Sequence, residues 1–204
     1  MGYVSRWCIM LLLSMAVSAC STPPEPVPLM NLQAQPADST WRTAAIIVAH
    51  DTQRYLVPYV IITPENAPQL HTLQIPITLL ADQDAQIPWR NDHGIRYAPV
   101  IITGTLATPL RFAHVSAIET ALSETRVASM PQYQLVRVIG LLNTHPDGTH
   151  IHDQTTPVQH LAFRPAWVTG STPLRLAEGA PVMIEGVRVN NTLIPLVIAP
   201  VVTR

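Results

Sequence analysis

Histidines gather in one short stretch of the chain, where their spacing is suited to binding a metal ion. The stretch begins at His145, passes through a turn-like Pro-Asp-Gly and continues to His150 and His152. Side chains alternate between the two faces of a strand, so a strand over residues 149–153 places His150 and His152 on one face. Two such imidazoles, with His145 as a third ligand, suit zinc or copper. Alternative third ligands are His160 and Asp153.

The same stretch is also compatible with less specific roles. It follows a polar hairpin turn, which favours histidines that are simply hydrated. Histidine changes its charge between pH 5 and 8, so a pH-sensitive surface is a further interpretation. A metal site, hydrated side chains and a pH-sensitive surface therefore all remain open.

Tryptophan close to arginine is a second pattern with a chemical meaning. Trp89 stands between Pro88 and Arg90, and Trp167 follows Arg-Pro-Ala. Tryptophan and arginine are favoured at the centres of protein interfaces, and aromatic rings also stack on sugars. Trp89 and Trp167 are therefore candidate interaction residues, with packing inside the fold as the alternative.

Patterns typical of known catalytic sites are absent from the sequence. There is no Gly-x-Ser-x-Gly, no His-Glu-x-x-His, no phosphate loop and no dinucleotide fingerprint. The 12 basic residues are all arginine, and the net charge of −1 leaves no basic patch for nucleic acid. We therefore expect a protein that is not an enzyme and does not bind nucleic acid.

The amino terminus has the pattern of a secretory signal peptide. Arg6 precedes an apolar run over residues 9–16, which is shorter than the ~20 residues that span a bilayer. The sequence Val17-Ser18-Ala19-Cys20 follows, and it resembles the lipobox of bacterial lipoproteins. The resemblance implies that residues 1–19 are removed and that Cys20 carries lipid. The residue after that cysteine is serine, and in this the chain resembles lipoproteins that are sorted to the outer membrane.

This resemblance gives an expected location and role. The protein would sit on the periplasmic face of a bacterial outer membrane, with Cys20 as its one remaining cysteine and no disulfide in the folded part. We expect a non-enzymatic binding or scaffold component of an envelope assembly, which contacts the membrane and protein partners and has no cofactor beyond its lipid. The alternative is a periplasmic ligand binder that takes a metal at the histidines or a saccharide.

Residues 20–41 contain five prolines and are expected to form a lipidated tether. Such a segment favours extended polyproline II, which over residues 21–40 at ~3.1 Å per residue reaches about 60 Å. Three apolar residues interrupt it, namely Leu29, Met30 and Leu32. A hydrated tether or docking of these residues onto a partner are the two interpretations.

The composition of the chain predicts an all-β fold. Charged residues make up 12%, about half of the usual ~25%, while 20 prolines argue against long helices. Turns are predicted at Asp147-Gly148 and Asn190-Asn191. Strands are predicted over residues 44–49, 56–63, 70–80, 99–106, 110–115, 135–142 and 149–153.

Three pairs of similar segments in the same order suggest two copies of a unit of about 75 residues. We expect a first β domain over residues 42–125 and a second over residues 126–204. Trp89 and Trp167 would be equivalent, because their separation of 78 recurs among the matches. The matched segments are residues 98–104 and 180–186 (offset 82), 55–63 and 133–141 (offset 78), and 109–110 and 195–196 (offset 86).

Glycines inside the predicted strands indicate the kind of β fold. Gly104, Gly140 and Gly186 each interrupt an apolar strand, as bulges and bends do in small barrels. Over residues 43–204 this pattern resembles an oligonucleotide/oligosaccharide-binding (OB) type barrel. We therefore expect two tandem OB-like barrels, with a β-sandwich as the alternative. A capping-box pattern adds a short connecting helix over residues 119–126.

Overall fold

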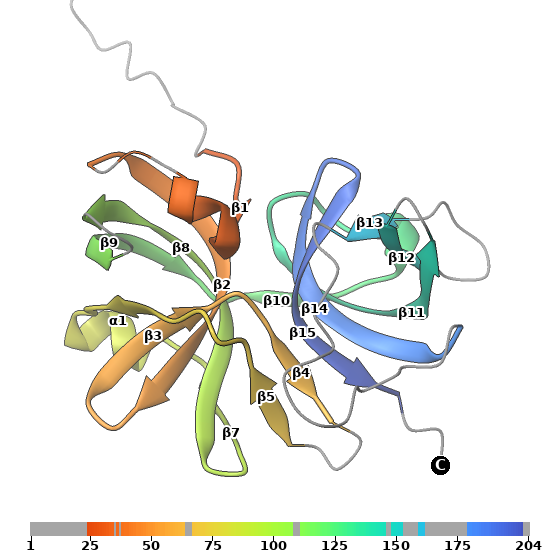
Figure 1. Ribbon diagram of the computed structural model, residues 1–204, viewed down its shortest axis with the longest axis horizontal. Helices are drawn as coiled ribbons and strands as arrows, with labels where there is room; N and C mark the ends of the chain where they lie inside the picture. The colour runs from red at the N-terminus through yellow and green to blue at the C-terminus, as the bar shows by residue number, and fades with distance from the viewer. Residues whose placement is uncertain are drawn as a thin grey trace, which may run out of the picture.

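The chain is built mainly of β-strands, as its composition predicts (Figure 1). The computed structural model describes residues 24–34, 36, 38–63, 67–107, 111–145, 148–152, 159–161 and 179–201. Within these ranges there is one α-helix, α1 (Ala81–Ala85), and two 3-10 helices, η1 (Leu29–Ala34) and η2 (Val127–Ser129). No helix in the described ranges is long and apolar enough to cross a membrane.

The described strands form two sheets, which Figure 1 shows as two lobes side by side. Sheet A has seven strands: β1 (Val27–Pro28), β2 (Thr40–His50), β3 (Gln53–Val57), β6 (Ile75–Ile77), β7 (Arg90–Asp92), β8 (Ile95–Ala107) and β9 (Arg111–Glu119). Sheet B has eight: β4 (Val60–Ile62), β5 (Pro68–Leu70), β10 (Leu122–Glu124), β11 (Leu135–His145), β12 (Gly148–His152), β13 (Gln159–Leu161), β14 (Pro181–Val189) and β15 (Thr192–Pro200).

The first hairpins of the two sheets have the same register. In sheet A, Ile46 pairs with Val57, and the hairpin ends at the pair His50 and Gln53. In sheet B the corresponding pairs are Leu141 with His152 and His145 with Gly148. A shift of 95 residues therefore relates β2–β3 to β11–β12.

The second hairpins repeat each other as well, including a bulge. In β8–β9 the register shifts between Thr103 and Gly104, and in β14–β15 it shifts between Glu185 and Gly186. A Cβ on Gly186 would collide with the carbonyl oxygen of Ile194, so the bulge requires glycine there. The match at offset 82 and the bulges expected at Gly104 and Gly186 are confirmed, whereas the ladders of β11 show no register shift at Gly140.

The other two matches of the sequence comparison are wrong. Residues 133–141 include the start of β11, the counterpart of β2 and not of residues 55–63, which hold β3 and β4. Strand β9 corresponds to β15 at an offset of 80 rather than 86, because Ile102 pairs with Ile118 as Ile184 pairs with Ile198. Alternating apolar strands resemble one another in many registers, so only the match containing glycine fixes the alignment.

Each repeat begins with a short strand and an apolar 3-10 turn. Strand β1 runs parallel to β2, and β10 runs parallel to β11. After β1, the side chains of Leu29 and Leu32 are 1% exposed in the core of sheet A. After β10, Val127 and Met130 enter the core of sheet B in the same way. Residues three apart share one side of a 3-10 helix, which explains this spacing.

Two expectations about connecting segments are therefore corrected. Leu29 and Leu32, expected in the tether over residues 20–41, are core residues of the first unit, and strand β1 begins at Val27. Residues 119–126 do not form a connecting helix, because β9 continues to Glu119 and β10 follows directly. Helical propensity in this segment yields to the parallel pairing of β10 with β11.

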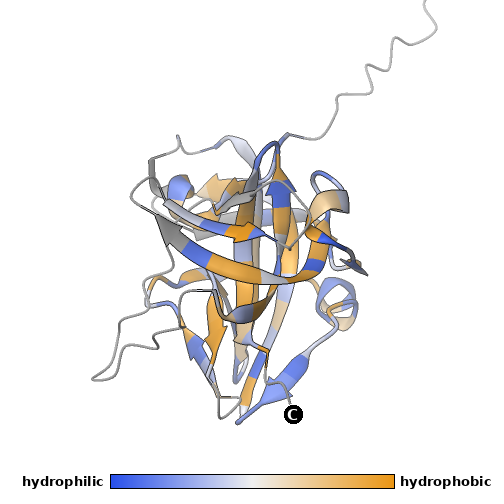
Figure 2. Cartoon of the chain, turned by 90° about the vertical axis from the view of Figure 1, so that its right-hand side faces the viewer, coloured by the Kyte–Doolittle hydropathy of each residue, from blue (hydrophilic) through white to orange (hydrophobic). Residues whose placement is uncertain are grey.

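The described residues form three apolar cores, and Figure 2 shows the apolar residues running along the long strands. One core lies on the inner side of each sheet. The third lies between the sheets, where sheet A contributes Ala44, Ile46 and Ile101, and sheet B contributes Val187 and Ile194. Strand β2 is therefore buried on both faces, and the two sheets form one packed body.

The β4–β5 hairpin links the two sheets. The expected strand over residues 56–63 is divided at Pro58, which has no N–H to donate to a ladder. Strand β3 pairs within sheet A, whereas β4 pairs in parallel with β15 in sheet B. Residues from the first repeat thus complete the sheet of the second.

Across the residues that the structure describes, neither sheet has the full ladder of a closed barrel. Within the described residues of sheet A no ladder joins β6 to β9. In sheet B the connection runs through β13, which shares only two residue pairs with β12 and two with β15. The expectation of an all-β chain is confirmed, but closed barrels are not seen.

Candidate functional site

The histidine cluster lies on the outer face of β12. The structure has this strand over residues 148–152, against the predicted 149–153, and His150 and His152 share a face as expected. His150 is buried, and Nε2 of His152 lies 2.8 Å from Nδ2 of Asn143 on the neighbouring strand β11. The backbone register places His150 opposite both Asn143 and His160.

Several residues of the sequence predictions fall outside the described part of the chain. These are the side chains of His145 and His160 and all of Cys20, Asp153 and Trp167. In the part that is described, no group of three or more His, Cys, Asp or Glu side chains is placed to hold a metal ion. The metal hypothesis therefore rests on the register of β12 and its neighbours.

Trp89 is engaged by arginines of its own chain. It lies between α1 and β7, where the guanidinium carbons of Arg54 and Arg96 are 5.4 and 5.0 Å from its ring centroid. Its indole N–H donates to the carbonyl oxygen of Asp84 over 3.3 Å. These contacts use cation–π attraction and fix the ring against the end of α1.

Arg54 and Asp84 form a paired-charge contact beside this tryptophan. Nε and Nη2 of Arg54 donate to the two carboxylate oxygens of Asp84 over 2.7 and 3.0 Å. The hydrogen bonds from Arg54 lower the pKa of Asp84, and the same pair raises the pKa of Arg54. Both groups therefore stay charged over a wide pH range.

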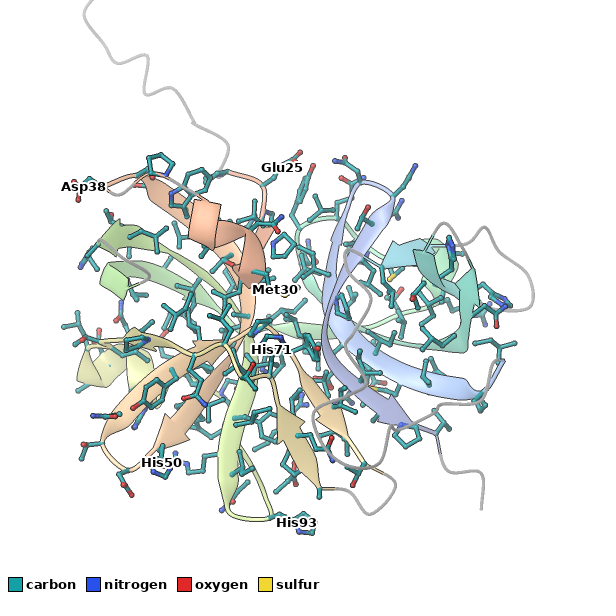
Figure 3. The ribbon with its side chains drawn as sticks, in the orientation of Figure 1. Glu25, Met30, Asp38, His50, His71 and His93 are labelled. Carbon is teal, nitrogen blue, oxygen red and sulfur yellow. The ribbon has the colours of Figure 1, made fainter. Side chains whose placement is uncertain are left out.

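Two open clefts meet at Tyr55 on the first hairpin of sheet A. The larger, of about 640 Å³, lies between β3, β6 and α1 and has Arg54 and Asp84 in its wall. The smaller, of about 360 Å³, is lined by apolar residues such as Val48, Val57 and Leu70. Figure 3 shows His50, which also lines the smaller cleft, near the tip of the β2–β3 hairpin. Such mixed polar and apolar walls are suited to binding a small ligand.

A buried ionic cluster joins the two sheets. Glu185 of β14 is fully buried and its carboxylate oxygens lie 2.7 Å from Nη1 of Arg90 and from Nη2 of Arg137. Arg90 comes from β7 of sheet A, whereas Arg137 comes from β11 and also pairs with Glu124. Sequence reasoning missed this cluster, and the one signal was a glutamate inside the apolar run of residues 182–187. The two arginines neutralise the buried charge of Glu185 where the sheets meet.

Two aromatic side chains next to this junction have shifted pKa values. Burial, together with the hydrogen bond that its hydroxyl donates to Asp92, raises the pKa of Tyr97. Burial lowers the pKa of His71, whose ring packs edge-on against Tyr59 at 5.0 Å between centroids. Figure 3 shows His71 close to where the two sheets meet. A neutral His71 and a neutral Tyr97 fit this largely apolar junction.

Comparisons with known proteins add no relative: no family model, no curated protein and no solved structure matches the chain. The described geometry therefore defines the class by itself. It is an all-β protein of two repeated units whose sheets share one core. Its candidate sites are the two clefts at Tyr55 and the outer face of the second unit.

Proposed function

We propose that the protein is a lipoprotein anchored to the outer membrane through Cys20, whose two β units bind protein partners on the periplasmic side without catalysing a reaction. The observation that carries this proposal is Val17-Ser18-Ala19-Cys20 directly after the apolar run of residues 9–16. The lipid holds the chain at the membrane, and the β units provide the surfaces for binding.

The position of the first strand defines how such an anchor would work. Strand β1 begins at Val27, seven residues after Cys20. At no more than ~3.5 Å per residue, this length reaches about 25 Å. The first unit is therefore held close to the bilayer, well within the ~60 Å that an extended segment over residues 21–40 would allow.

We further propose that each repeat is an OB-type unit. In the second repeat the ladders run from β11 to β12, β13, β15 and β14, and β14 pairs again with β11. Counted along the chain, β13 and β15 are the third and fifth of these strands, and they pair in parallel, while the other four pairings are antiparallel. An OB fold is a partly open five-stranded Greek-key barrel, and this order supports that assignment over a sandwich.

Replacing Cys20 tests the anchor. Cells that produce the wild-type protein and the Cys20→Ala variant are grown with radiolabelled palmitate, and their membranes are separated by density. We expect label in the wild type only, with wild type in the outer-membrane fraction and the variant released or unprocessed. A matched Cys8→Ala variant should behave as wild type. Equal labelling of both variants, or none in wild type, contradicts the proposal.

A second candidate function is binding of a metal ion at the histidine face. The observation that favours it is the register, which puts His150 opposite His160 and on the same face as His152. Titration calorimetry with zinc and with copper, on wild type and on His150→Ala/His152→Ala, decides this point. Binding in wild type that is lost in the double variant supports the site, and equal weak heats remove it.

The second candidate function, binding of a ligand, includes a saccharide as the alternative to a metal ion. The larger cleft combines Gln53, Arg54 and Asp84 with the ring of Tyr55, and such groups hydrogen-bond and stack on sugars. Titration with peptidoglycan and lipopolysaccharide fragments, on wild type and Tyr55→Ala, tests it. No change in affinity in the variant would remove this cleft as the site.

A further inference from the structure

The outer face of β11 and β14 carries exposed apolar side chains. Ile139 is 59% exposed and pairs with Met183, while the half-buried Leu141 pairs with the exposed Pro181. Ala199 of β15 continues the row beyond Met183. These five residues are called the β11–β14 face below. Within the described residues, Ile139 and Leu80 are the large apolar side chains classed as exposed.

The same face of the first unit is covered. The strand registers make Ala44, Ile46, Pro99 and Ile101 of sheet A the counterparts of Ile139, Leu141, Pro181 and Met183. All four of these sheet A residues are buried, and Ala44, Ile46 and Ile101 belong to the core between the sheets. One position in the fold is thus a buried interface in one repeat and an exposed surface in the other.

The surface that covers the first unit has a defined chemistry. It consists of Leu135, Val187, Ile194 and Leu196, which come from β11, β14 and β15 of sheet B. The two repeats therefore meet head to tail, through different surfaces, and not through one shared surface. A head-to-tail contact between two units leaves the equivalent surface of the second unit without its counterpart.

We propose that the β11–β14 face binds the apolar outer surface of a β-sheet in another protein, in the way that sheet B covers sheet A within this chain. The face is continuous with the existing interface, because Met183 also packs against the core between the sheets. Its edges are polar, with Asn143 and His152 on one side and Arg137 on the other. An apolar centre with a polar rim is the usual anatomy of a protein interface.

A second copy of this chain lacks the surface that a head-to-tail contact requires. The register counterparts of Leu135, Val187, Ile194 and Leu196 in the first unit are Thr40, Thr105, His114 and Ser116. All four are polar, and Thr40, His114 and Ser116 are exposed. Continuing the head-to-tail arrangement with a second copy would bury these groups against Ile139, at a cost in free energy. A second copy is therefore disfavoured as a head-to-tail partner, and the proposal commits to a different protein.

This inference rests on the binding role proposed above, but not on the lipid anchor. The test is photo-crosslinking in the cells that make the protein, with a photoreactive amino acid at position 139 of the full chain. The matched control carries it at position 80, where Leu80 is 61% exposed. We expect at least tenfold more adduct with one other protein from position 139 than from position 80.

The adduct must also have the predicted chemistry. Mass spectrometry should map the cross-linked residue to an apolar position on a sheet of the partner, and Leu141→Arg should reduce the yield at least fivefold. Circular dichroism is used to check that Leu141→Arg is folded. Met183→Arg is the second variant, which tests the same face if Leu141→Arg does not fold. Any one of three results overturns the proposal: an adduct of twice the chain mass, equal yields at positions 139 and 80, or a partner contact through a charged loop.

Repeating the experiment in the Cys20→Ala chain separates the two proposals. If the anchor proposal fails, both chains have the same location and give the same adduct. If the β11–β14 face does not bind, no specific adduct forms in either chain, whatever their location.

Discussion

The long hairpins of the two repeats have matching registers but different surroundings. In the first, the outer face of β2 and β8 is packed against sheet B, and small Ala44 stands where the second repeat has Ile139. In the second, Thr103 of β8 is replaced by Glu185, whose charge is matched by an arginine of sheet A. The hairpin registers thus match between the repeats, while the outer-face residues differ with what each repeat contacts. Outer-face residues of each repeat therefore report its contacts better than inner-face residues do.

Removing the charge of Glu185 should have the largest effect on stability. The Glu185→Gln variant leaves Arg90 and Arg137 without their carboxylate at the sheet junction, and breaking a buried ion pair on one side costs about 3–5 kcal/mol. Urea unfolding measures this loss. The control is Thr103→Ala at the equivalent position, for which about 1 kcal/mol or less is expected. Similar losses in both variants would mean that the junction is not specific to the second repeat.

Truncating a core side chain of the 3-10 helix η1 should cause the next largest loss of stability. Leu32→Ala removes a buried side chain from the core of sheet A and should lower the free energy of unfolding by about 2–4 kcal/mol. Val127→Ala tests the corresponding 3-10 helix η2 in sheet B and should lower the free energy of unfolding by about 1–3 kcal/mol. A wild-type unfolding midpoint for Leu32→Ala would restore the interpretation of this segment as a hydrated tether.

The Arg54–Asp84 pair should contribute a small, pH-dependent stability to the first repeat. Because Arg54 lowers the pKa of folded Asp84 below its unfolded value of about 3.9, the contribution is present above about pH 4. It is lost as the pH falls through the folded pKa. The pair is partly exposed, so Asp84→Asn should cost less than about 1 kcal/mol at pH 7. Unfolding curves at pH 7 and pH 3 measure this, and a difference that grows at pH 3 contradicts the assignment.

Changing the exposed face of the second repeat should have the smallest effect on stability. Ile139→Arg places a charge at a position that is already in water, so the unfolding free energy should change by less than about 0.5 kcal/mol. Thermal unfolding of this variant and of Leu80→Arg provides the comparison. A loss of more than 2 kcal/mol for Ile139→Arg alone would show that the face is covered within the chain.

The sequence was sufficient to predict the all-β fold and several of its details. Apolar runs identified β2 and β8, and the glycine at position 186 marked its bulge correctly. The burial of Leu29 and Leu32 in the core of sheet A was not predicted. The prolines around them favour an extended chain, and their burial depends on strands that are distant in sequence. The Arg90–Glu185 pair was missed for a similar reason, since 95 positions separate the two residues. Local pattern thus predicts strands and turns but not how two sheets pack together.

The crossing of β4 into sheet B also constrains the order of folding. Val60 pairs with Val197, close to the end of the chain, and the ladder between them joins residues far apart in sequence. Long-range parallel pairing forms slowly, because the entropy cost of closing a long loop comes before the stabilising contacts form. Strands β2, β3, β8 and β9 all precede residue 120 and can assemble while the rest of the chain is still arriving. The β4–β5 hairpin must wait for β15, so the two units become joined there only once the last strand is in place.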